Sequence, residues 1–191
     1  MRKALLPLLL LAAACEDGGN GTAADGNGAA APRGGPTTEV EPAKATLLQA
    51  LSDSADHATL VNAIRAAGLA ETLSGAQPYT LFAPTEAAFR KLPPGTVNDL
   101  LAPEAKGQLV AMLTGHIVPG AVTAADLGRA IERGKGKAAL ATVGGANLTF
   151  SRSGDAILVT DAAGGQARLA GDERLQSNGV VHAVDGVLSS R

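Results

Sequence analysis

Apolar residues in the first half of the folding region recur every three or four positions, which is the spacing of an amphipathic helix. The pattern begins at Leu47 and predicts two short helices, the second capped by Asp56 and ended by Gly68. Further helices with the same pattern are expected at 96–101, 103–114 and 124–131. The first half of the domain is therefore expected to be mainly helical.

A brief run of strand-forming residues interrupts this pattern at 79–83. Thr85 follows two positions later and is placed to cap a helix that starts with Glu86, a residue that favours the positive helix end. That helix would carry Phe89 to the core and would stop at Pro93. We expect a strand that leads through a tight corner into a helix.

The pattern changes from helical to alternating in the second half of the chain. Strands are expected near 139–143, 147–151, 156–160, 166–170 and 180–184. Gly144-Gly145, Gly154 and Gly164-Gly165 supply the turns, because glycine adopts positive backbone angles without strain. A helical half followed by a strand-rich half predicts an α+β fold with helices packed on one side of antiparallel sheets.

The start of the chain has the pattern of an export signal. Arg2 and Lys3 precede an apolar run from Ala4 to Ala14 that is too short to span a bilayer. Ala12-Ala13-Ala14-Cys15 then resembles a bacterial lipobox, in which a signal peptidase cuts before a lipid-bearing cysteine. We predict a signal peptide at 1–14 and lipidation of Cys15, since no second cysteine is present to form an internal disulfide. An ordinary signal peptide cut near Ala14 is the alternative.

Residues 15–42 are rich in Gly, Ala, Asp, Asn and Pro and show no apolar periodicity. Such a segment is typical of a flexible tether. The remaining residues, 43–191, number about 150, the size of one ordinary domain. The expected organisation is a signal peptide, a tether and one domain anchored at a membrane surface.

Composition narrows the classes of partner. Of the 191 residues, 46% are hydrophobic but only 2% are aromatic, so the core must be built mainly from Leu, Val, Ile and Ala. The formal net charge is −2, and without Arg2 and Lys3 the balance is 14 basic against 18 acidic side chains, or −4. This balance gives no general attraction to nucleic acid, which we exclude as a partner.

Three ordered segments carry a resemblance to a known family. They read Tyr79-Thr-Leu-Phe-Ala-Pro-Thr-Glu-Ala-Ala-Phe89, then Gly115-His-Ile-Val-Pro-Gly120, then Ser177-Asn-Gly-Val-Val-His-Ala-Val-Asp-Gly-Val-Leu188. In this order and spacing they resemble the signature segments of the fasciclin domain. The resemblance implies a fasciclin-like wedge of two antiparallel β-sheets with several helices packed along one edge. It also implies a role in adhesion or binding.

Two departures limit what the resemblance implies about binding residues. Animal fasciclin domains have been linked to integrin contact through a Tyr-His segment and an Asp-Ile pair. Here Gly115 replaces the tyrosine before His116, and Glu173-Arg174 stand where Asp-Ile would fall. The integrin sites are therefore not carried over to this chain.

Chemically active residues are few. His116 and His182 could form a metal pair, but no cysteine remains to join them, and we expect each histidine to be hydrogen-bonded to backbone in or beside a strand. Ser177, His182 and Asp185 suggest a triad, yet Ser177 and His182 would point to opposite faces of an extended strand. We expect no catalysis, no metal and no cofactor.

Four cations gather within nine residues at the end of the 124–131 helix and in the loop after it: Arg129, Arg133, Lys135 and Lys137. A solvated helix end would have such a pattern, because cations favour a helix C-terminus. The functional alternative is contact with an acidic polysaccharide or a phosphate-bearing envelope polymer.

Together these features predict an exported bacterial protein that Cys15 anchors in the cell envelope, at the surface or on the periplasmic face. Its domain is expected to be a non-catalytic adhesion or binding module that recognises a protein or polysaccharide. The alternative is a periplasmic protein that binds a small ligand or an envelope component, and a sizeable apolar pocket would favour it.

Overall fold

The computed structural model of the chain describes residues 45–189, without the side chain of Asp172. The expected signal peptide (1–14), Cys15 and the expected tether (15–42) lie outside the described residues. Within 45–189, no helix combines the length and the apolar character that crossing a membrane requires.

The helices follow the expected sequence ranges closely. They are α1 (Leu47–Ser52), α2 (Ala58–Ala67), α3 (Ala70–Ser74), α4 (Glu86–Arg90), α5 (Thr96–Leu101), α6 (Lys106–Thr114) and α7 (Ala124–Arg133), with 3₁₀ turns η1 (Ala55–His57) and η2 (Pro103–Ala105). Helix α5 has the expected bounds, whereas α3 was not expected. Gly68 ends α2 with φ of 80°, a left-handed conformation in which glycine has no Cβ clash.

The expected cap of α2 was wrong. Asp56 lies in η1, and the residue before α2, His57, makes no side-chain cap. The cap comes from Glu86 instead, whose carboxylate accepts hydrogen bonds from the Thr59 backbone N–H (2.7 Å) and the Thr59 hydroxyl (3.0 Å). Thr85 caps α4 as expected, because its side-chain oxygen accepts from the Ala88 N–H.

Within residues 45–189, seven strands form one mixed sheet. They are β1 (Tyr79–Pro84), β2 (Ile117–Pro119), β3 (Lys137–Ala141), β4 (Asn147–Ser153), β5 (Ala156–Thr160), β6 (Gln166–Gln176) and β7 (Gly179–Val184), in the spatial order β2-β1-β7-β6-β5-β4-β3. The expected pair of antiparallel sheets is not confirmed, because the long strand β6 pairs with β5 at one end and with β7 along the rest, and β1 and β7 are parallel.

The two edges of the sheet approach each other, which makes it barrel-like. Val143, just after β3, donates its backbone N–H to the carbonyl of Ile117 in β2 at 2.8 Å. The strand order is that of an open sheet, but the sheet is curved enough that its two edges, at β2 and just after β3, are joined by this hydrogen bond.

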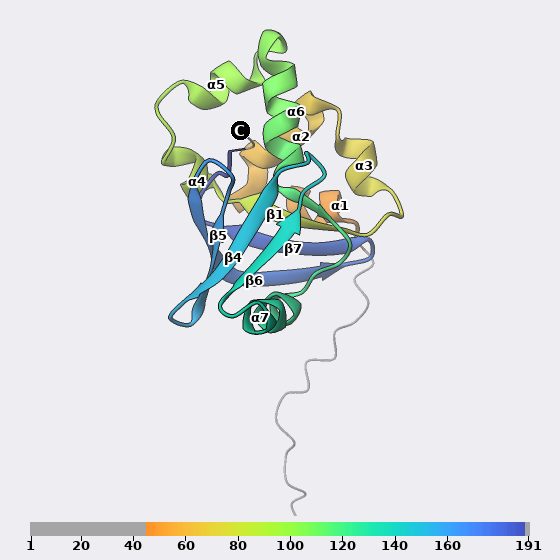
Figure 1. The fold of residues 1–191 in the computed structure, drawn as a ribbon. Helices are drawn as coiled ribbons and strands as arrows, with labels where there is room; N and C mark the ends of the chain where they lie inside the picture. Colours follow the sequence, from red (N-terminus) through yellow and green to blue (C-terminus); the bar gives the residue numbers. More distant parts are fainter. Residues whose placement is uncertain (1–44, 190–191) are drawn as a thin grey trace, which may run out of the picture. The chain divides into compact units, whose positions relative to one another are not determined.

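Two hydrophobic cores lie on opposite faces of the central strands. On one face Leu81, Ala83 and Val181 join the apolar side chains of α1, α2 and α6. On the other face Phe82 and its neighbours join α7, with Phe82 and Phe150 ring centroids 5.2 Å apart. Helix α7 lies across the sheet from α5 and α6 (Figure 1), so the helices do not all pack along one edge.

The parallel pair β1–β7 depends on one glycine. The register places Tyr79 opposite Gly179, and a Cβ added to Gly179 would lie 1.8 Å from the Tyr79 carbonyl oxygen. The preceding Asn178 is buried and joins distant elements: its side-chain oxygen accepts from the Leu47 N–H (2.8 Å), and its amide nitrogen donates to the Leu73 and Gly75 carbonyls. No other residue fits at Gly179 without moving a strand.

Candidate functional site

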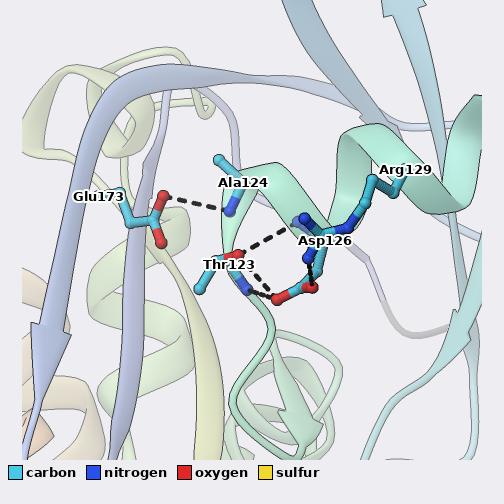
Figure 2. Close-up of polar contacts among 5 residues, drawn as sticks. All are labelled: Thr123, Ala124, Asp126, Arg129 and Glu173. Atoms are coloured by element: carbon cyan, nitrogen blue, oxygen red, sulfur yellow. Dashed lines mark hydrogen bonds and ion pairs between the residues drawn. The ribbon is translucent and has the colours of Figure 1, made fainter.

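Helix α7 is joined to the sheet at its first turn (Figure 2). The Thr123 hydroxyl accepts from the Asp126 backbone N–H (3.1 Å), and the Asp126 carboxylate accepts from the Thr123 N–H (3.2 Å), which forms a capping box. Glu173 of β6 accepts from the Ala124 N–H at 3.1 Å. Two carboxylates thus lie at the positive end of α7, where the helix dipole favours negative charge.

Asp126 is held ionised by these contacts. Hydrogen bonds from the Thr123 side chain and backbone, and then from Arg129, lower the pKa of Asp126 to about 2. Its other carboxylate oxygen accepts from the Arg129 guanidinium. The charge of Arg129, one of the four cations singled out in the sequence, is therefore compensated within the helix.

The remaining three cations lie at the opposite end of α7. Arg133 is in the last helical turn, Lys135 has φ of 55°, and Lys137 begins β3. The turn is tight, because a Cβ on Gly134 would lie 1.8 Å from the Lys137 carbonyl oxygen. All three side chains are exposed, and none has an ion-pair partner among the side chains that the structure describes. We call Arg133, Lys135 and Lys137 the basic turn.

Arg152 of β4 lies beside α7 and was not singled out from the sequence. Its Nη2 atom is 3.4 Å from the Glu132 carboxylate and 3.1 Å from the point where a Cβ of Gly128 would be. Arg152 is distant from α7 in sequence, so the sequence does not predict their contact. The only local sign is Gly128, a glycine in the middle of an amphipathic helix, which leaves room for another side chain to pack. The Glu132 carboxylate, next to Arg133 in sequence, is thus paired with Arg152 and not with a cation of the basic turn.

All three histidines are buried and bonded to backbone, as expected. His57 Nδ1 lies 3.2 Å from the Pro84 carbonyl, and His182 Nε2 lies 2.8 Å from the Val122 carbonyl. His116 Nδ1 lies 2.8 Å from the Met112 carbonyl, while its Nε2 accepts from the Leu188 N–H at 3.0 Å. Burial lowers the pKa of His116 and of His182 below the usual 6.5, which favours the neutral rings.

The residues of the hypothetical triad have separate partners. The Ser177 hydroxyl donates to the Ala45 carbonyl, and His182 bonds to Val122. Asp185 accepts from the Arg168 backbone N–H at 2.7 Å and from Lys91, and these contacts lower its pKa. Within the described chain, no three side chains among His, Cys, Asp and Glu are arranged to hold a metal ion.

An apolar groove lies between α5, α6 and the segment after β7. Its volume is about 520 Å³, and its walls include Leu92, Leu100, Met112, Val187 and Leu188. Ligand pockets usually have volumes between about 300 and 1,000 Å³. The groove is therefore of a size that can hold a small molecule.

The three family-like segments come together as β2, β1 and β7, which are neighbours in the sheet. Nearly all their strand residues are buried, including every residue of β7. Their side chains build the two cores and leave the surface to other parts of the chain. Burial of these residues indicates that the segments serve the packing of the domain.

Residues 55–190 match the model of the fasciclin domain family. Protein sll1483 of Synechocystis sp. is 39% identical over 143 residues, which cover 75% of this chain and 72% of that protein. The cell surface glycolipoprotein MPB83 of Mycobacterium bovis is 36% identical over 94 residues, or 49% of this chain and 37% of that protein. This chain thus spans little more than a third of MPB83.

Among solved structures, a FAS1 domain pair from the insect cell adhesion molecule fasciclin I has the same fold. The TM-score is 0.66 with 16% sequence identity, and the match covers 76% of this chain and 51% of that chain. At this identity the likeness concerns the fold alone. The mixed, barrel-like sheet flanked by helices is accordingly an arrangement already known from solved structures.

Proposed function

Because this chain belongs to the fasciclin domain family, we propose that its domain is a non-catalytic recognition module of a bacterial cell envelope, anchored by a lipid on Cys15. Support for the anchor comes from the lipobox-like Ala12-Ala13-Ala14-Cys15 and from the similarity to MPB83, a cell surface glycolipoprotein. Support for recognition comes from the family, whose insect member is named as a cell adhesion molecule.

The anchor is tested by fractionation and by protease treatment of intact cells. Wild-type protein should be found with membranes, and Cys15→Ser should shift it to the soluble exported fraction. Release of the domain from intact cells by protease would support exposure at the surface, and protection until the envelope is opened would support the periplasmic face. Equal membrane association of the wild type and Cys15→Ser would overturn lipidation.

The partner of the basic turn is proposed to be an acidic polymer, such as a polyuronate or a phosphate-bearing envelope polysaccharide. The observation that carries this is the exposure of three cations that have no ion-pair partner among the described side chains, in a chain whose net charge is negative. An exposed charge pair is worth only about 0–1 kcal/mol. Binding by one domain would therefore be weak, and many copies on one cell would strengthen it.

The triple variant Arg133→Glu, Lys135→Glu and Lys137→Glu tests this partner, with alginate as the acidic probe and dextran as the neutral one. Wild-type protein should bind alginate less as salt rises, and the variant should lose that binding. A matched variant reverses three exposed cations elsewhere, namely Arg65, Arg90 and Lys106, and has the same net charge. It should keep binding, and equal loss in both variants would mean that total charge, rather than the basic turn, is recognised.

The apolar groove favours a second candidate function, the binding of a small apolar ligand. Decanoate can serve as the probe, followed by chemical-shift changes at groove residues such as Leu100 and Met112. Met112→Lys would place a charge in the groove and should remove saturable binding, whereas the triple basic-turn variant should bind decanoate normally. No saturable shift in the wild type would exclude this function for decanoate-like ligands.

A further inference from the structure

A second pocket, smaller than the apolar groove, lies at the N-terminal end of α7, where the pairing of the neighbouring strands is interrupted. β5 pairs with β6 only through Leu158–Thr160, and the pairing of β6 with β7 is irregular between Leu169 and Glu173. The gap between these strands and the start of α7 has a volume of about 170 Å³. It lies apart from both the basic turn and the apolar groove.

The imidazole ring of His182 lines this pocket and is nearly buried. The side chain is only 2% exposed, and its Nε2 must carry a proton, because its partner at 2.8 Å is the Val122 carbonyl, which can only accept. The ring stacks on Phe82, with centroids 5.4 Å apart. Burial lowers the pKa of His182, so the ring is neutral at pH 7 and its Nδ1 is a hydrogen-bond acceptor.

Nδ1 of His182 has no hydrogen-bond partner among the described residues. Among the described residues, every side-chain nitrogen or oxygen that is fully shielded from solvent has a hydrogen-bond partner. Nδ1 therefore keeps access to solvent, and the pocket that His182 lines provides it. His182 thus brings a nearly buried acceptor, without a protein partner in the described chain, to the wall of this pocket.

The other polar side chains of the pocket wall are also acceptors. Glu173 uses Oε2 to accept from the Ala124 N–H, and Figure 2 shows its second oxygen turned away from that bond. Asp155 contributes another carboxylate, and neither lysine nor arginine lines the pocket. Ile157 and Leu169 add apolar wall. A fitting ligand has a positive charge, several N–H donors and an apolar stem.

We propose that this pocket binds an alkylammonium group, carried by a lysine side chain of a partner protein or by a free aliphatic amine. An ammonium group has three N–H donors, which match the two carboxylates and the imidazole nitrogen in number. The volume corresponds to that of on the order of five liquid water molecules, enough for a short methylene chain. The site does not depend on the basic turn or on the lipid anchor.

The test follows backbone amide shifts of the ¹⁵N-labelled full chain as probes are added. The probes are n-butylammonium, cadaverine and Nα-acetyl-lysine methylamide, with n-butanol as the neutral control of similar size. We expect saturable shifts at Gly171 and Ala183 with the ammonium probes and none with n-butanol. Binding of the lysine derivative would identify a protein partner as the source, and binding of the free amines alone would identify a small amine.

Two single substitutions test whether the carboxylates of the pocket bind the ammonium group. Asp155→Asn removes charge from an exposed turn, and Glu173→Gln removes charge but keeps an oxygen that can accept from Ala124. Each should weaken butylammonium binding roughly tenfold or more, as expected for loss of a charged hydrogen-bond partner. Asp53→Asn, an equal charge change at an exposed residue of another element, should leave binding unchanged. Wild-type-like affinity in Asp155→Asn and Glu173→Gln, or shifts of equal size with n-butanol, would overturn the proposal.

Discussion

At the scale of single residues, His116 joins two parts of the domain through opposite roles of its ring nitrogens. Nδ1 donates to the Met112 carbonyl in α6, and Nε2 accepts from the Leu188 N–H in the segment after β7. The side chain has no exposed surface. A second ring proton would place an N–H against the N–H of Leu188, so only the neutral ring satisfies both contacts.

This arrangement predicts a loss of stability in weak acid. Because burial lowers the pKa of His116 in the folded domain below 6.5, the unfolded chain takes up the proton first. The free energy of unfolding should be highest above pH 6.5 and should fall below it, by up to about 1.4 kcal/mol per pH unit for one histidine. Urea unfolding from pH 7.5 to 5 measures the slope.

His116→Gln is the matched variant for this measurement. It should be less stable than the wild type at pH 7.5 but should lose less stability on acidification. His182 also has a lowered pKa, so some pH dependence will remain in the variant. Identical pH profiles of the two proteins would show that His116 does not couple folding to protonation.

Residue roles that depend on distant partners could not be predicted from the sequence. Asp56 has the side-chain type and the position of a cap for α2, but the carboxylate that caps α2 belongs to Glu86. Asn178-Gly179 has the pattern of a turn, yet Asn178 bonds to α1 and to the end of α3. Spacing along the chain identifies a suitable residue type and does not reveal which suitable residue is nearest in space.

At the scale of elements, α7 shows how local and tertiary contacts fix one helix. Its capping box needs only Thr123 and Asp126, whereas its third contact needs Glu173 from β6. Thr123→Ala should lower the free energy of unfolding by about 0.5–2 kcal/mol, because the Asp126 N–H would lose its acceptor. Thr123→Ser keeps the hydroxyl and should restore most of the loss. Equal stability of Thr123→Ala and the wild type in urea unfolding would contradict the importance of this cap.

The kind and place of most elements followed from hydrophobic spacing, but their partners did not. The expected strand at 156–160 and helix at 96–101 agree with β5 and α5. Strand β2, only three residues long, was missed, because so short a strand shows no period. β7 is buried on both faces, so its sequence does not indicate which neighbour it pairs with or in which direction.

In the candidate sites too, groupings that are local in sequence could be predicted, whereas groupings that depend on the folded chain could not. The cations of the basic turn lie within five positions of each other, so the sequence alone brought them together. Arg129 had to be removed from that group, since its pairing with Asp126 depends on side-chain geometry. The smaller pocket could not be predicted, because its walls come from the start of α7 and three strands that meet only in the folded sheet.

At the scale of the whole molecule, the parallel pairing of β1 and β7 joins segments a hundred positions apart. Gly179→Ala should disrupt it, because the new Cβ would lie 1.8 Å from a backbone oxygen that side-chain rotation cannot move. The cost should exceed the ~1–3 kcal/mol typical of an overpacked core.

Gly107→Ala provides the control for this prediction. Gly107 lies in α6, and a Cβ there would meet no atom within 4 Å. That variant should be as stable as the wild type or more stable by up to about 1 kcal/mol, because alanine favours a helix. Circular dichroism and urea unfolding compare the two variants, and a folded Gly179→Ala of wild-type stability would contradict the predicted clash.

β7 is the last strand of the described chain, yet it lies inside the sheet between β1 and β6. During synthesis, neither β1 nor β6 can pair with β7 until residues 179–184 have been made. Closing a contact of such long sequence separation is also slow. A chain truncated before Gly179 can therefore form local hairpins such as β4–β5, but it cannot complete either of the two cores to which β7 contributes.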